Sequence, residues 1–349
     1  MEAYNVLKRD SCSNGNDYDG HMGLRISSIF VILIGSTFGA LFPVVAKRFS
    51  KAEGAPKWAF FIAKYFGSGV IIATAFIHLL APAEEALTNS CLTGVITEYS
   101  WVEAIVLMTI VVLFFVELMV MRFARFGTGH LHDEEGHSHV QIEDETTITQ
   151  QVSQSKHYIP GEDHLGHTRS HHDADDSEKE RQAIEDYTAQ LTSIFILEFG
   201  VVFHSVFIGL TLAVTGAGFI TLYIVLVFHQ TFEGMGLGSR IAQVPWPKSK
   251  RLTPYFLGLG FGISTPIAIA IGLGVRQSYP PDSAKTLIVT GVFDSISAGI
   301  LIYTALVELL AHEFMFSNAM REAPIRDVLL AFLLLCLGAA LMALLGKWA

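Results

Sequence analysis

Three side chains that can bind metal lie inside segments that are otherwise apolar. His229 and Glu233 belong to the motif HQTFEG, which follows the apolar run ITLYIVLVF, and His204 belongs to LEFGVVFHSVFIGL. Residues four apart share one face of an α-helix, so His229 and Glu233 should point the same way. A carboxylate at the centre of a membrane helix costs about 2.5–3.5 kcal/mol, which a bound cation would offset. Two imidazoles and one carboxylate are a common ligand set for a divalent cation.

The overall composition is typical of a membrane protein. Of the 349 residues, 51% are hydrophobic and only 16% are charged, whereas soluble domains carry about 25% charged residues. The formal net charge of −10 argues against a nucleic-acid partner. The three cysteines include no CxxC motif and are too few for a disulfide framework.

Eight apolar segments lie along the chain, each long enough to cross a hydrocarbon core of about 30 Å. A backbone in lipid must satisfy its own hydrogen bonds, so these segments should be helices. The sequence therefore predicts an all-α polytopic membrane protein in a lipid bilayer. Its eight transmembrane helices are expected at 24–46, 58–80, 101–121, 189–214, 218–239, 253–275, 285–311 and 327–346.

Basic residues gather in alternate loops. Lysines and arginines follow the first, third, fifth and seventh predicted helices, whereas the loop 81–100 has none. Basic loops stay in the cytoplasm, so both termini should be extracellular. The expected divisions are an extracellular tail at 1–23, helices 1–3 within 24–121, a cytoplasmic loop at 122–188 and helices 4–8 within 189–349.

Two of the cysteines fall on the external side of this topology. Cys12 lies in the N-terminal tail and Cys91 in the loop 81–100. The sequence leaves open whether they form a disulfide or remain unpaired thiols.

The cytoplasmic loop is polar, acidic and rich in histidine. Its composition predicts disorder, and short His-rich tracts favour metal binding over an incidental polar linker. A flexible chain has no fixed geometry, so we expect a sensor or buffer here and not a catalytic or transport centre. The loop contains nine histidines, and the expected regulatory metal ligands are His130, His132, His137, His139, His164, His167, His171 and His172, with His157 between the two clusters.

The predicted topology brings the first three side chains to one depth. His204 lies near the middle of segment 189–214, and His229 and Glu233 lie near the middle of segment 218–239. The turn TGAG between these segments is very short, so the two helices should be adjacent and antiparallel. This arrangement predicts a divalent metal site. The alternative is a set of interhelical hydrogen bonds that only stabilises the bundle.

Other ionisable residues lie toward the two membrane surfaces. Each of them either lines a path for the ion or is an interfacial side chain that reaches water. The expected entrance comprises His78, Glu84, Glu85 and Asp294, and the expected exit comprises Glu117, Glu198, Glu308 and His312.

The motifs HSVFIG, HQTFEG, GVIIATAFIH and SAGILIYTALVELLAHEF resemble those of the ZIP family of divalent metal transporters, closest to its fungal and plant zinc/iron-regulated branch. The resemblance implies a bundle of three, two and three helices, with the outer triplets related by an inverted repeat. It also implies that His204, His229 and Glu233 are the primary ligands. Family members move metal toward the cytoplasm, and an elevator-like movement is one mechanism.

The chain departs from members that hold two adjacent ions. At the positions that would supply an Asn and further acids it has Ser205, Ile208, Gln230 and Thr265. We therefore expect one strong central site, with Ser205 and Gln230 as weak or water-mediated contacts.

A ligand set without thiolate suits Zn²⁺ or Fe²⁺, and the Irving–Williams order places zinc above iron. The expected function is transport of zinc into the cytoplasm, with Fe²⁺ or other divalent metals as further substrates and no cofactor. The resemblance implies the plasma membrane. The oligomeric state stays open, and a homodimer is compatible with the sequence.

Two rival functions are an intramembrane zinc hydrolase and a membrane metal sensor. The sequence has no HExxH motif, and no clear general base remains once Glu233 is a ligand. The acids expected on both sides of the membrane favour passage over hydrolysis. In the sensor reading the His-rich loop is the primary site.

Overall fold

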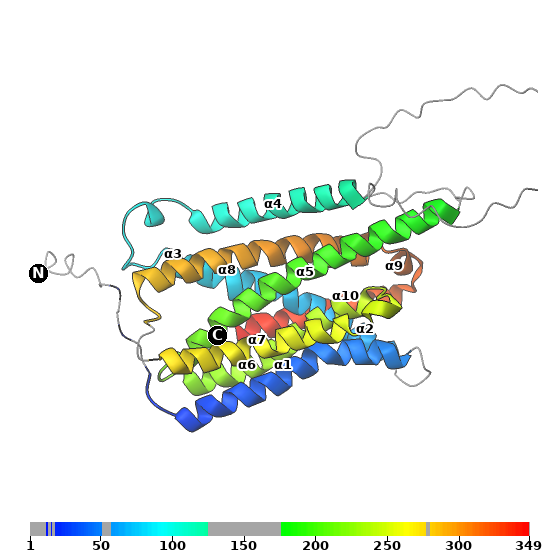
Figure 1. Ribbon diagram of the computed structural model, residues 1–349. Helices are drawn as coiled ribbons and strands as arrows, with labels where there is room; N and C mark the ends of the chain where they lie inside the picture. The colour runs from blue at the N-terminus through cyan, green and yellow to red at the C-terminus, as the bar shows by residue number, and fades with distance from the viewer. Residues whose placement is uncertain are drawn as a thin grey trace, which may run out of the picture.

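The long helices run side by side along one common direction (Figure 1). This computed structural model describes residues 12, 15, 18–50, 57–124, 176–276 and 280–348. Among these residues there is no β-strand, and eight helices are long and apolar enough to cross a membrane. The predicted all-α membrane fold with eight spans is confirmed.

The spans are built from ten α-helices and two π-helical segments. The α-helices are α1 (Met22–Ser50), α2 (Lys57–Ala73), α3 (Ala81–Leu87), α4 (Trp101–Ala124), α5 (Asp176–Val214), α6 (Phe219–Gln243), α7 (Thr253–Val275), α8 (Ala284–Thr304), α9 (Asn318–Glu322) and α10 (Ile325–Leu345). The π-helical segments are η2 (Thr74–Leu80) and η5 (Ala305–Met315), and the short 3₁₀ turns are η3 (Val95–Thr97) and η4 (Lys248–Lys250).

Two spans change helix type partway across. The second span continues from α2 through η2 into α3, and the seventh continues from α8 into η5. A π-helical turn inserts extra backbone into a helix and often marks a functional site. Here η2 contains His78 and η5 contains His312 and Glu313.

Helix α5 begins at Asp176, well before the start at 189 that hydropathy predicts. Its first part, DSEKERQAIEDY, is polar but rich in good helix formers such as Glu, Lys, Arg, Gln and Ala. A search for apolar segments cannot detect such a helix, because its residues lack the apolar character of a membrane span.

The contacts between helices divide the bundle into two groups. In the first block, α1 packs on α6 and α7, and α5 packs on α7. In the second block, α2 packs on α10, and α3 and α4 pack on α8. The blocks meet where α2 contacts α6 and where α5 contacts α8. At the first of these meetings a Cβ on Gly236 would lie 2.7 Å from the carbonyl oxygen of Gly67, so a side chain there would push the blocks apart.

The contact pairs follow a pattern that repeats once along the chain, and an inverted relation between the two copies stays a prediction. In such a repeat, spans 1–3 correspond to spans 6–8, and span 4 corresponds to span 5. The contact between α1 and α6 then has its counterpart between α7 and α5. The contact between α2 and α10 has its counterpart between α8 and α4, and the contact between α2 and α6 has its counterpart between α8 and α5. All of these pairs are in contact, and the two π-helical segments lie in the corresponding second and seventh spans. The grouping into three, two and three helices stays a prediction.

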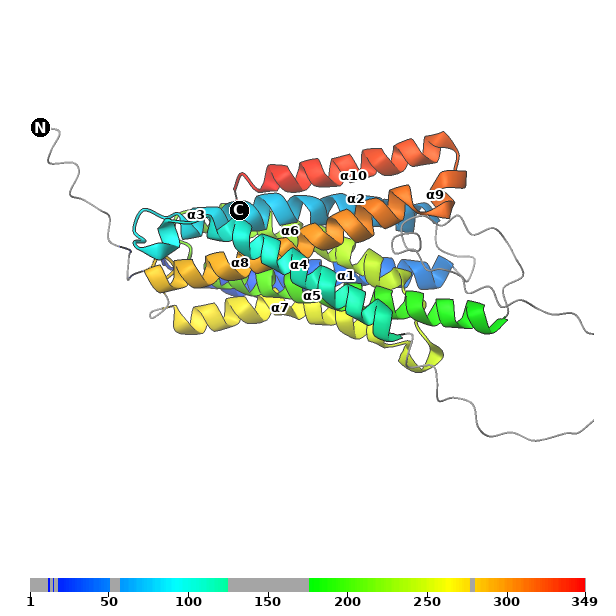
Figure 2. The same cartoon turned by 90° about the horizontal axis from the view of Figure 1, so that it is seen from above.

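Helices α4 and α10 lie at the periphery of the bundle. Figure 1 shows α4 along one edge, and Figure 2 shows α10 along one edge after a turn of 90°. Both helices expose large apolar side chains, including Phe114, Phe115, Leu329 and Leu333. A surface of this kind is suited to contact with lipid chains.

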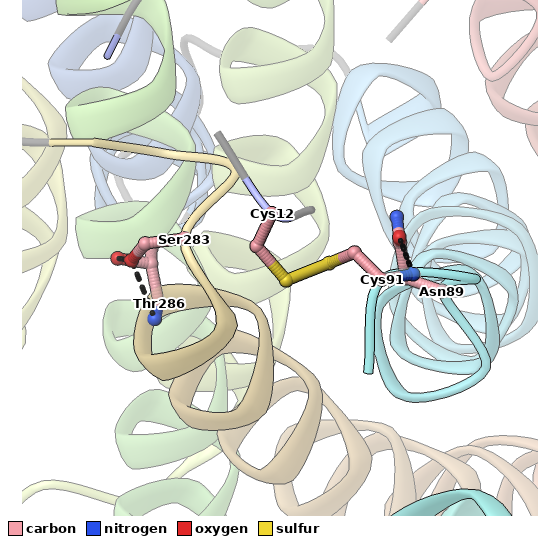
Figure 3. Close-up of a disulfide and its surroundings, with 5 residues drawn as sticks. All are labelled: Cys12, Asn89, Cys91, Ser283 and Thr286. Carbon is pink, nitrogen blue, oxygen red and sulfur yellow. Dashed lines mark hydrogen bonds between the residues drawn. A yellow bond between two sulfur atoms is a disulfide. The ribbon is translucent and has the colours of Figure 1, made fainter. Parts of the chain in front are cut away.

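The structure shows that Cys12 and Cys91 are paired. Cys12 and Cys91 form a disulfide with a Cα–Cα distance of 5.0 Å, which joins the segment before α1 to the loop between α3 and α4. Figure 3 shows this bond beside the start of α8, where Ser283 caps the helix by accepting a hydrogen bond from the backbone N–H of Thr286 at 3.2 Å. Cys336 is free and exposed. The disulfide lies at the end of the bundle opposite the basic loops.

Candidate metal centre

The turn between α5 and α6 is held by a fully buried arginine. Arg25 of α1 donates from Nη1 to the carbonyl oxygens of Leu212 and Ala213, at 3.0 and 3.1 Å, and from Nη2 to that of Thr215. These carbonyls at the end of α5 have no partner within the helix, and a cation is favoured at that end. Arg25 therefore ties α1 to the pair of helices that carries His204 and His229.

The three side chains singled out by the sequence lie together in the interior. His204, His229 and Glu233 are 3%, 0% and 0% exposed. The ring centroids of His204 and His229 are 5.6 Å apart, and His229 Nε2 lies 3.5 Å from Glu233 Oε2. The expected same-face relationship of His229 and Glu233 and the expected proximity of α5 and α6 are both present.

Two residues from the second block extend this cluster. The ring of His78 in η2 lies 4.6 Å from that of His229, centroid to centroid, and its Nε2 lies 2.9 Å from the carbonyl oxygen of Met342. Asp294 of α8 places Oδ1 3.8 Å from His204 Nδ1. Both were expected along the entrance, and both are buried against the central pair. We call His78, His204, His229, Glu233 and Asp294 the central cluster.

Most donor atoms of the central cluster have no hydrogen-bond partner. Both ring nitrogens of His204 and of His229, both carboxylate oxygens of Glu233 and Oδ1 of Asp294 are buried and unpaired. Each such atom costs free energy because it has lost its contacts with water. Nitrogen and carboxylate oxygen are the atoms that a borderline divalent cation prefers, so the chemistry of the cluster fits such an ion.

The donors are gathered but do not yet converge. Across the described parts of the chain, no three His, Cys, Asp or Glu side chains are positioned to hold a metal ion together as they stand. Binding would therefore require the side chains of the central cluster to turn toward a common point.

Two of the four departures from the two-metal pattern, Ser205 and Gln230, directly follow the ligands His204 and His229 in the sequence. Gln230 and Ser205 are fully buried, with Gln230 Nε2 and Ser205 Oγ 3.5 Å apart, and Gln230 Oε1 has no partner. Thr265 is also buried with its hydroxyl unpaired, and Ile208 is half-buried. None of these four side chains is acidic, so they cannot neutralise a second divalent ion.

The remaining residues of the expected path lie farther out. Glu84 and Glu85 are exposed on α3, and His312 is exposed in η5. Glu117 is half-buried and accepts a short hydrogen bond from Tyr303, and Glu198 is half-buried with Oε2 unpaired. The side chain of Glu308 and the eight expected loop ligands, His130 to His172, lie outside the described residues.

The sequence reasoning missed a group of charged residues in which Arg240 and Glu313 are buried and Lys64 is partly buried. Glu313 of η5 pairs with Lys64 of α2 and with Arg240 of α6. Arg240 was assigned to a cytoplasmic loop when the topology was predicted from basic residues. Lys64 and Glu313 lie near the ends of their spans, where a charge is expected to reach water. A usable signal is the acid of the motif AHEF next to His312, since a charge inside a span needs a partner.

Comparison with known proteins agrees with the motifs and the fold. The family model described as ZIP Zinc transporter matches residues 22–346. Zinc-regulated transporter 2 of Saccharomyces cerevisiae is 42% identical, with 97% of each chain covered. Zinc transporter 3 of Arabidopsis thaliana is 34% identical, with 97% of this chain and 89% of the relative covered. The chain belongs to the ZIP family of zinc transporters.

Proposed function

We propose that this protein moves Zn²⁺ across a membrane into the cytoplasm, with His204, His229 and Glu233 as the ligands that hold the ion midway. The supporting observation is the set of buried, unpaired nitrogen and oxygen donors on α5 and α6. In a family of zinc transporters, a buried polar cluster without hydrogen-bond partners is best explained by an ion that visits it.

The ligand set suits an ion that must also leave. Three protein ligands leave a fourth position for water, unlike a closed structural zinc site. Ser205 and Gln230 can hold that water, because both lie beside the ligands and neither is charged. The order of affinities favours zinc over iron at such a site, and Fe²⁺ is the weaker substrate.

The residues of the second block take part in delivery. His78 and Asp294 touch the central pair from η2 and α8, while Glu84 and Glu85 lie exposed on α3, nearer the disulfide end. An ion attracted by the exposed acids would meet His78 and Asp294 before His204 and His229. Movement of the first block relative to the second, in the manner of an elevator, would then carry the ion toward the basic loops.

The orientation rests on two independent features. Basic loops mark the cytoplasmic side, and the Cys12–Cys91 disulfide lies at the opposite end, as expected for an oxidising compartment. Both termini are then extracellular. The plasma membrane is proposed from the family resemblance alone.

The histidines of the loop regulate the protein or sense cytoplasmic metal, and they are dispensable for transport. Their number in a polar acidic segment supports this role.

The decisive experiment measures flux of radioactive zinc into vesicles that contain the pure protein, followed by the same assay with Fe²⁺, Mn²⁺, Co²⁺ and Cd²⁺. Zinc should accumulate above protein-free vesicles, and excess unlabelled zinc should compete better than iron. Binding without flux would support a sensor and cleavage of a membrane substrate without flux would support a hydrolase, and either result would overturn the proposal.

A further inference from the structure

A group of three charged side chains, two of them buried, joins the two blocks near the end that carries the basic loops. Glu313 is 7% exposed and accepts a hydrogen bond from Arg240 Nη1 at 2.7 Å. Lys64 Nζ contacts the other carboxylate oxygen, Oε2. We call Lys64, Arg240 and Glu313 the ionic triad. Arg240 belongs to the first block, while Lys64 and Glu313 belong to the second.

The ionic triad lies between the central cluster and the cytoplasmic end of the bundle. Arg240 follows Glu233 by two turns of α6, which corresponds to about 10 Å along the helix. A polar cavity of about 310 Å³ adjoins the triad and is lined by all three of its members together with Gln190, Ile194 and Gln243. The amide nitrogen of Gln243 is buried there without a partner. The triad therefore lies beside a polar space on the side where an ion would leave.

The triad places two cationic side chains, Lys64 and Arg240, against one buried carboxylate. A divalent cation approaching from Glu233 would meet these cations, and the repulsion is stronger where water is scarce. Placing charges in the interior also costs free energy that apolar side chains would avoid, so stability alone is a weak reason for their presence.

We propose that the ionic triad is the inner gate of the transport path. The bond between Arg240 and Glu313 holds the two blocks together and blocks release. When the blocks move apart, the bond breaks and the Glu313 carboxylate becomes available to the outgoing ion. This inference rests on the proposed transport function, and it adds Arg240 and Glu313 as residues that control release without binding the ion at the central cluster.

The gate makes a prediction that a purely structural triad does not. Within the ionic triad, the Arg240–Glu313 bond crosses between the blocks, whereas Lys64 and Glu313 belong to the same block. Arg240→Met and Glu313→Gln should therefore open the inner end, while Lys64→Met should leave it closed. A triad that only stabilises the fold would show no such difference between Arg240→Met and Lys64→Met.

The first test measures access from the cytoplasmic side. Ile194 lines the cavity and is 3% exposed, so Ile194→Cys in a Cys336→Ser background reports on opening. A membrane-impermeant maleimide is added to the cytoplasmic face of vesicles that contain the full chain. We expect labelling at least about threefold faster in Glu313→Gln and Arg240→Met, because the open population rises. The control Glu322→Gln makes the same chemical change at an exposed position and should label at the parental rate.

The second test separates the gate from transport itself. With a leaking inner gate, fewer molecules hold the state that accepts external zinc, so the apparent KM for zinc should rise at least about threefold. Glu313→Asp keeps the charge, so its labelling rate at residue 194 and its apparent KM for zinc should both lie close to those of the parent. If zinc flux is present but labelling at residue 194 is equal in the parent, Glu313→Gln and Arg240→Met, the gate is refuted and the transport function stands. The gate would also be refuted if Lys64→Met accelerated labelling at residue 194 as much as Arg240→Met does.

Discussion

The imidazole ring of His78 lies 4.6 Å from the ring of His229, although the two residues belong to different blocks of the bundle. The π-helical segment η2 carries His78 to this position. Contact across the block boundary means that the central cluster changes whenever the blocks move. An ion held by His204, His229 and Glu233 would then move toward or away from His78 during transport.

Replacement of His78 should weaken uptake without abolishing it. In His78→Ala the zinc uptake at low zinc should fall about tenfold, the size of effect seen when a residue that supports a metal ligand is removed. His21→Ala removes an exposed histidine and serves as the matched control. Uptake of His78→Ala equal to that of the control would remove His78 from the path.

Glu233→Ala should reduce zinc uptake to background while the protein still reaches the membrane. The carboxylate is the only acid of the proposed ligand set, so its loss leaves a divalent charge uncompensated in a buried site. Uptake is measured in cells and normalised to the surface amount of protein. Glu322→Ala, at an exposed position, is the comparison, and full uptake by Glu233→Ala would exclude the proposed site.

Zinc uptake should weaken as the external pH falls below about 6, near which free imidazole takes up a proton. Only neutral imidazole binds metal, so protons compete with zinc and the apparent KM rises as the pH falls. The apparent KM at pH 5 should therefore exceed the apparent KM at pH 7. An equal KM at the two pH values would count against ligation by histidine.

Loss of the disulfide should lower stability more than it lowers transport. Cys12→Ser removes a link between residues separated by 79 positions, and the expected loss in the free energy of unfolding is about 2–4 kcal/mol. Thermal unfolding of the purified protein measures the change, with Cys336→Ser as the control because that thiol is free. Equal unfolding of the two variants would show that the bond contributes nothing to stability.

Deletion of residues 130–172 should leave zinc flux intact in purified vesicles. The proposed transport ligands all lie in α5 and α6, outside the deleted segment. In cells the same deletion should change the amount of transporter after exposure to high zinc, which immunoblotting detects. Absence of flux from a well-folded deletion variant would show that the loop is required for transport.

The sequence predicted the spans and the core of the candidate site well, for identifiable reasons. Apolar length identifies a transmembrane helix, the spacing of His229 and Glu233 places them on one face, and the four-residue turn TGAG forces α5 and α6 together. These are local properties of the chain, and local properties can be read without coordinates.

Relationships between distant helices were harder to read. Position along a span placed His78 and Asp294 near the entrance, but helix packing and the π-helical segment η2 bring them to the central pair. Hydropathy also treats charges near helix ends as surface charges, which hid the pairing of Glu313 with Lys64 and Arg240. The sequence also left undecided whether Cys12 and Cys91 form a disulfide, because the topology places both thiols on one side without giving the distance between them.

The disulfide also limits how far the first block can travel. It fastens the chain ten residues before Met22 to the α3–α4 loop of the second block, and α1 is in turn attached to the α5–α6 turn through Arg25. Ten residues reach at most about 36 Å when fully extended, whereas one helical turn is only about 5.4 Å. The proposed movement, if it covers one or two turns, would therefore fit within this covalent tether and would not require reduction of the disulfide.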